Sequence, residues 1–143
     1  MIKRLVFTIS LLVAAVGMQL SQAHSPPDGA RVFIIEPADG AVVTSPVLVK
    51  MGIEGFGITP AGTKGKRRHS AGHHHVLLDL EQLPDMDEPI PRDANHVHLD
   101  AGETDVLLEL PPGEHSLQLL LGDEEHEPFE PSLISEKIRV TVK

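Results

Sequence analysis

The sequence predicts an all-β protein, a small antiparallel immunoglobulin-like β-sandwich of six or seven strands with long loops. A different small barrel or sandwich is the alternative. Three observations support this class: apolar residues alternate with polar ones at a period of two, β-branched residues gather in short apolar runs, and glycine or proline separates the runs. No window carries the sustained apolar stripe and caps of a helix, so a sandwich is expected.

Each expected strand is bounded by a turn signal or a long polar loop. The first apolar run ends at Pro37-Ala38-Asp39-Gly40, and Pro111-Pro112-Gly113-Glu114 separates two later strands. In the fourth strand, the apolar residues Val106, Leu108 and Leu110 alternate with Asp105, Leu107 and Glu109. In the last strand, Ile138, Val140 and Val142 alternate with Arg139 and Thr141. The expected strands cover residues 32–35, 47–53, 76–80, 105–110, 116–121 and 138–142.

Residues 1–23 are typical of a bacterial secretory signal peptide. Lys3 and Arg4 precede an uncharged, mostly apolar stretch over residues 5–20, and Ser21-Gln22-Ala23 places small residues at the −3 and −1 positions of a cleavage site. A membrane anchor is the alternative, but the stretch is short for a span of about 20 residues. We therefore expect a signal peptide over 1–23, a single secreted domain over 24–143, no membrane span after cleavage, and a periplasmic or extracellular location.

The charge of the chain restricts its partners. The net charge is −9, and loss of Lys3 and Arg4 with residues 1–23 removes two positive charges and leaves −11. So acidic a protein is not expected to bind nucleic acid, which requires a basic surface, but it attracts cations. The chain has no cysteine, so its stability must come from core packing, with help from a bound metal.

The histidines gather after three loops. A glycine-rich loop over 59–72 leads to His73-His74-His75, a proline-rich loop over 83–95 leads to His96 and His98, and an acidic loop over 122–132 contains His126. Imidazole is the commonest protein ligand of transition metals, and long structureless loops in a small domain are often functional. If the three loops lie at one end of the sandwich, the histidines meet.

The spacing of the histidines predicts which side chains share a face. In a strand, residues two apart point to the same side, so His73 and His75 share a face opposite to His74, and His96 pairs with His98 in the same way. Sites rich in nitrogen and without thiolates suit Cu(II), Zn(II) or Ni(II). A carboxylate, Asp79, Asp100 or one near His126, is a further ligand or an outer partner. The predicted ligands are His73, His75, His96 and His98, with His126 and His74 as secondary candidates.

Two other functions compete with a binding site for Cu(II) or Zn(II). In the first, the protein is an envelope interaction or structural module, and its histidines only hydrogen-bond backbone groups to hold the loops. In the second, it is a metalloenzyme with an open coordination position. No nucleophile elbow, phosphate-binding loop or zinc-protease motif occurs, so neither a catalytic residue nor an organic cofactor is predicted, and a binding domain is favoured over an enzyme. His24, if it becomes the first residue after cleavage, offers an amine–imidazole chelate as a separate site.

Ordered motifs along the chain resemble a family of small secreted bacterial proteins, the domain of unknown function 4399 family. The resemblance covers nearly the whole of residues 24–143 and implies a secreted, β-rich domain without an established activity. Members of the family often carry a further histidine about where Phe129 stands here. The motifs are Thr59-Pro60-Ala61-Gly62, Gly72-His73-His74-His75 before Leu77-Leu78-Asp79, Pro89-Ile90-Pro91, His96-Val97-His98, Leu110-Pro111-Pro112-Gly113 before His115, Leu117-Gln118-Leu119, Leu120-Leu121-Gly122-Asp123, His126 and Ser135-Glu136-Lys137-Ile138.

Overall fold

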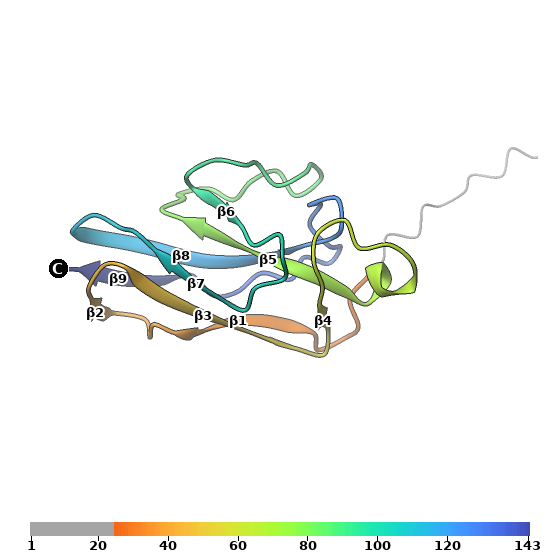
Figure 1. Cartoon of the computed structure of the whole chain (residues 1–143), viewed down its shortest axis with the longest axis horizontal. Coiled ribbons are helices and arrows are strands. Elements are labelled where there is room, and N and C mark those ends of the chain that lie inside the picture. Colours follow the sequence, from red (N-terminus) through yellow and green to blue (C-terminus); the bar gives the residue numbers. More distant parts are fainter. Residues whose placement is uncertain (1–24) are drawn as a thin grey trace, which may run out of the picture.

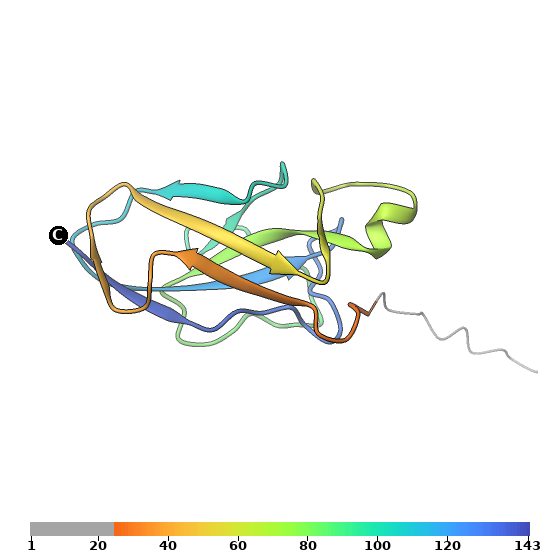
Figure 2. The same ribbon diagram turned by 90° about the horizontal axis from the view of Figure 1, so that it is seen from below.

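Two β-sheets pack face to face in the computed structural model, which describes residues 25–143 (Figures 1 and 2). The predicted all-β sandwich is confirmed. Within this part of the chain, no helix is long and apolar enough to cross a membrane. The expected signal peptide and His24 lie outside the described residues and stay predictions.

The smaller sheet is antiparallel and has the strand order β1-β3-β7. The larger sheet has the order β2-β9-β8-β5-β4. In addition, β6 pairs with β5, at residues that lie further along β5 than those that pair with β4. A short 3₁₀ turn, η1 (Lys66–His69), precedes β5. The strands are β1 (Arg31–Glu36), β2 (Ala41–Val43), β3 (Val47–Glu54), β4 (Gly57–Ile58), β5 (Ala71–Leu78), β6 (His96–His98), β7 (Asp105–Leu108), β8 (Gly113–Gly122) and β9 (Ile138–Val142).

The strand inventory differs from the sequence prediction in two respects. Among the described residues there are nine strands rather than six or seven, because β2, β4 and β6 have only two or three residues, too few for a period of two to be visible. β5 also begins at Ala71, five residues before the expected start, because its first two residues pair with β4 and the residues from His73 on pair with β8. The histidine triplet therefore belongs to a strand. The pairs β2–β9 and β4–β5 are parallel.

The main core lies between the two sheets and follows the alternation of their strands. β3 contributes Val47, Val49 and Met51, and β8 contributes Leu117 and its inward neighbours at 119 and 121, all at most 4% exposed. Each such side chain contributes about 1.5–3 kcal/mol when fully buried. Because the chain has no disulfide, this packing carries most of the stability.

A second, smaller apolar cluster lies on the outer face of the larger sheet. Leu77 of β5 and Leu120 of β8 contact Ile90, and Met86 and Ile134 pack against them. These contacts hold the segment between β5 and β6 over the sheet, on the side away from β1 and β3 (Figure 1). The long loop that leads to His96 and His98 is thereby anchored on this face.

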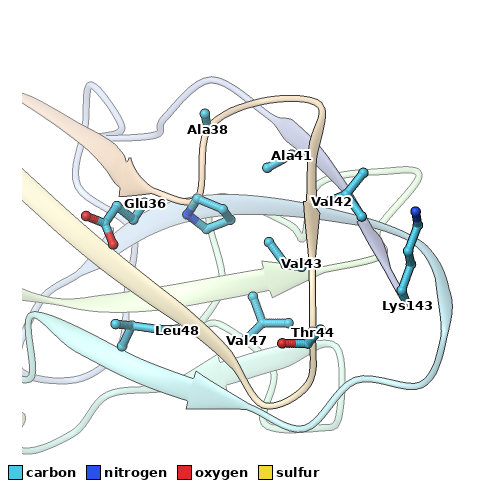
Figure 3. A pocket seen from close by; sticks show the side chains of 10 residues that line it. Glu36, Ala38, Ala41, Val42, Val43, Thr44, Val47, Leu48 and Lys143 are labelled. Carbon is cyan, nitrogen blue, oxygen red and sulfur yellow. The ribbon is translucent and has the colours of Figure 1, made fainter.

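An open apolar groove of about 540 Å³ lies beside β2 and the C-terminal residue Lys143 (Figure 3). Val42, Val43 and Leu48 are among its lining residues, none of which is a histidine. β2 pairs with β9 next to the first residues of β8, whereas the histidines of β5 pair with the last residues of β8. The groove is therefore remote from the histidines.

Truncation of the core leucine Leu119 tests the packing. Leu119 is 0% exposed, so Leu119→Ala is expected to lower the free energy of unfolding by about 2–5 kcal/mol. The matched control is Leu107→Ala in β7, whose side chain is 62% exposed and should change it by less than about 0.5 kcal/mol. Urea unfolding followed by circular dichroism measures both, and equal losses would contradict the assigned core.

Candidate metal centre

The histidine triplet is divided between the two faces of β5. His73 and His75 point to the outer face, where their rings lie 4.5 Å apart, and His74 points to the opposite side, as the alternation of a strand requires. All three side chains are fully buried. β6 pairs antiparallel with β5 and sets His98 directly opposite His75, on the same face. The predicted sharing of faces is confirmed.

A tight turn after β8 brings His126 to this group. The Oδ1 of Asp123 accepts hydrogen bonds from the backbone N–H groups of Glu125 and Glu127, at 2.8 and 2.9 Å. Gly122 bridges to Pro128 and closes the turn. His126 itself has a φ of 68°, a left-handed conformation that is uncommon for residues other than glycine. The turn thus holds His126 in the conformation that aims its ring at the outer face of β5.

Four imidazoles form one cluster, in which three rings converge on the Nδ1 of His126. This atom lies 2.9 Å from the Nε2 of His73, 3.3 Å from the Nδ1 of His98 and 3.4 Å from the Nε2 of His75. The four nitrogens all lie within 4.8 Å of one another, so the group can hold a metal ion.

Hydrogen bonds among the rings cannot satisfy this arrangement. A ring nitrogen has either one proton or one in-plane lone pair, so the Nδ1 of His126 can make only one good bond to its three neighbours. The Nε2 of His98 lies 2.8 Å from the carbonyl oxygen of Pro91, which can only accept, so this nitrogen carries the proton. The Nδ1 of neutral His98 therefore directs its lone pair into the cluster, as a metal-binding histidine does.

Burial favours the neutral form of His73, His75 and His98. It lowers the pKa of His73 to about 4 and that of His75 to about 2, and neighbouring histidines lower both further because they repel a second positive charge. Burial also lowers the pKa of His98. Neutral imidazole is the form that binds a metal ion. His126 is 26% exposed at its side chain, so the cluster approaches the surface on its side.

Asp100 lies beside the cluster. Its Oδ1 is 3.7 Å from the Nδ1 of His98 and 3.9 Å from both the Nε2 of His73 and the Nδ1 of His126. Its other oxygen accepts a hydrogen bond from Arg92 at 2.8 Å. The expectation that a carboxylate accompanies the histidines therefore fits Asp100.

Gly122 leaves room for the His75 ring. A Cβ at position 122 would lie 2.6 Å from the Cε1 of His75, 3.2 Å from its Nδ1 and 3.3 Å from the Cδ1 of Ile90. Contacts this short force a displacement of the ring. Reasoning from the histidine pattern missed this residue, although Gly122 stands in one of the ordered motifs of the sequence.

Two predicted ligands lie outside the cluster. His96 shares the outer face but stands opposite Leu77, two pairs further along the strands, and its Nδ1 bonds to Asp93 at 2.7 Å. His74 faces the other side, and neither of its ring nitrogens has a hydrogen bond within the described part of the chain. The structure thus brings four of the six predicted ligands together, with His126 central, and places His96 and His74 outside this group.

Three further positions from the sequence analysis have other roles. Asp79 bonds the Nδ1 of His115 at 2.7 Å, so it is not available to the cluster. The Nε2 of His115 donates to the carbonyl of Pro111, and the Asp79 contact raises the pKa of His115, as befits a structural histidine. Phe129 packs edge-on against Phe56 in the main core.

Comparison with known proteins gives one match. A family model described as Domain of unknown function (DUF4399) matches residues 49–143, which contain all four clustered histidines together with Asp100 and Gly122. No curated protein and no solved structure matches the chain.

The buried histidines make the stability of the metal-free protein depend on pH. His73, His74 and His75 have pKa values of about 4, 4 and 2 in the folded state, below the ordinary 6.5. As pH falls below about 6.5, the unfolded chain binds protons that the folded chain does not, so stability is full above this pH and declines below it. His115, with its raised pKa, acts in the opposite direction but is a single group.

We therefore expect urea unfolding in the presence of a chelator to show a lower free energy of unfolding at pH 5.5 than at pH 7.5. The variant His74→Leu removes one of the three groups and should show a smaller difference between the two pH values. A free energy that is unchanged or higher at pH 5.5 would show that these imidazoles are not buried in their neutral form.

Proposed function

The chain belongs to the domain of unknown function 4399 family, and from this premise we propose that it is a secreted domain that binds one divalent transition metal ion. The ligands in this proposal are His73, His75, His98 and His126, and the ion is Zn(II) or Cu(II). The protein carries or buffers the ion, or presents it to a partner in the cell envelope, without turnover of a substrate. The convergence of four ring nitrogens within 4.8 Å of one another carries the proposal.

The spacing of the nitrogens suits the ions proposed. Zn–N bonds of about 2.0–2.1 Å in a tetrahedral site place neighbouring nitrogens about 3.3 Å apart. A tetragonal Cu(II) site with bonds of about 2.0 Å places neighbours about 2.8 Å apart and opposite ligands about 4 Å apart. The three contacts of the His126 Nδ1, at 2.9, 3.3 and 3.4 Å, lie in this range.

The surroundings of the cluster favour binding over loop stabilisation. If the histidines only stabilised loops, each ring would have a carboxylate or backbone partner, as His96 has in Asp93 and His115 has in Asp79 and Pro111. In the cluster, His98 has such a partner in Pro91, but the four nitrogens that face the centre contact one another. Four nitrogen ligands also leave no open position on a tetrahedral ion, which supports a binding role rather than a hydrolytic one.

The expected signal peptide and the acidic charge support a periplasmic or extracellular location. A net charge of −9 attracts cations from solution. The periplasm and the cell exterior are oxidising, and a metal site made of histidines without cysteine is not damaged by thiol oxidation there.

Titration of the untagged, metal-free protein with Zn(II) and with Cu(II) by calorimetry tests the proposal. We expect one ion per chain with submicromolar affinity, and a loss of at least about 100-fold in His73→Ala and in His75→Ala, because removal of a ligand costs more than removal of an outer partner. His98→Ala should behave in the same way.

Two variants provide matched controls, because they change the same residue type close by but outside the cluster. His74→Leu lies between two ligands on the opposite face, and His96→Ala lies two residues from His98. Both should keep the affinity within about 3-fold, since neither His74 nor His96 belongs to the group of four. Wild-type affinity weaker than about 10 μM, or equal losses in ligand and control variants, would refute the proposal.

Gly122→Ala tests whether the space beside His75 is needed. The added methyl group would displace the His75 ring, and affinity for Zn(II) should fall about 10-fold although no ligand is removed. Gly113→Ala, at the other end of β8, strains a residue with a φ of 135°. The added methyl group meets no atom within 4 Å. It should lower stability and leave the affinity unchanged. Equal affinity in the two variants would contradict the assigned position of His75.

A further inference from the structure

We infer that Asp100 is the anionic ligand of the metal centre and that Arg92 is the residue that positions it. This inference rests on the proposed function and adds to it a fifth donor, an oxygen, beside the four histidine nitrogens. It follows from two properties of the Oδ1 of Asp100: this atom lies beside the clustered histidines, and its capacity to accept hydrogen bonds is unused.

The two oxygens of Asp100 have different surroundings. Oδ2 bonds Arg92 at 2.8 Å in an exposed ion pair. Oδ1 is buried and has no hydrogen-bond partner among residues 25–143, although 44% of the side chain is exposed. A buried carboxylate oxygen without a partner is costly and calls for an explanation. A ligand to an ion held by the neighbouring histidines supplies one.

The distances place Oδ1 at the edge of the centre. It lies 3.7–3.9 Å from the ligand nitrogens of three of the four histidines, His73, His98 and His126. Ligand atoms around one ion are about 3 Å apart, so a shift of less than about 1 Å brings Oδ1 into coordination. Arg92 can keep its bond to Oδ2 during this shift, and it thereby fixes the carboxylate with Oδ1 turned inward.

Charge supplies an independent argument. Four neutral imidazoles leave a bound ion with its full double charge, and burial of an uncompensated charge is strongly unfavourable. His73 and His75 are fully buried, and the side chain of His98 is 3% exposed, so solvent compensates little of this charge. Asp100 provides one negative charge at the place where it is required.

Five donors also bear on the identity of the ion. Structural Zn(II) sites are almost always four-coordinate, whereas Cu(II) favours tetragonal sites of nitrogen and oxygen ligands. A centre of four imidazoles and one carboxylate therefore suits Cu(II). The spectra of Cu(II) report directly on its ligands.

The test compares Asp100→Asn with Asp93→Asn in the full, untagged chain. Asp93 is a matched control, because its carboxylate bonds a histidine, His96, that lies outside the cluster. Affinity for Cu(II) is measured by competition with a chelator of known affinity, and the ligand field by electron paramagnetic resonance. Asp100→Asn should lower affinity at least 10-fold and change the spectrum, whereas Asp93→Asn should change neither.

Arg92→Gln separates positioning from coordination. It should keep one bound ion but shift the spectrum and lower affinity by less than Asp100→Asn, because the carboxylate remains but loses its orientation. Asp100→Ala serves as a second variant if Asp100→Asn does not fold. Wild-type binding with the same affinity and spectrum in Asp100→Asn would overturn the role of Asp100 and leave the histidine centre standing. Absence of binding in the wild type would overturn both proposals.

Discussion

The pairing of β5 with β8 and β6 is the constraint on which the rest of this structure depends. Hydrogen bonds in register from His73 to Leu78 fix which side chains of β5 point outward, and a shift by one residue would exchange His73 and His75 for His74. The same pairing places His98 opposite His75 and Gly122 opposite His73. A ladder of backbone bonds thus sets the positions of three of the four clustered imidazoles.

The outer face of β5 is buried, although it carries His73 and His75. The cover comes from loops, and backbone contacts join these loops to one another. The N–H of Ile90 bonds the carbonyl of His126, and the N–H of Gly62 bonds the carbonyl of Glu124. Pro91 accepts from His98, and the N–H of Ala61 bonds the carbonyl of Asp100. Because the loops and the imidazoles hold one another, an ion at this centre would stabilise all three loops together.

The centre has a cost in stability. Imidazoles buried without full hydrogen bonding and a non-glycine residue in a left-handed conformation each cost of order 1–3 kcal/mol. The small sandwich offsets this with a leucine- and valine-rich core and without any disulfide. Such costs are concentrated at functional sites, where binding of a ligand stabilises the folded protein and offsets them. The arrangement of this site is therefore consistent with selection for binding rather than for stability alone.

The sequence by itself determined the fold class and the division of His73, His74 and His75 between two faces, because a period of two is a local property of a strand. It also indicated that three loops carry the histidines. Only the tertiary structure decided that His126 is central, that Asp93 holds His96 apart, and that Asp100 rather than Asp79 accompanies the cluster. These outcomes depend on turn conformation and on contacts between residues distant in the chain, such as His73 and His126, and no local pattern encodes them. The short strands β2, β4 and β6 were missed for the same reason, since pairing with neighbours rather than intrinsic preference makes them strands.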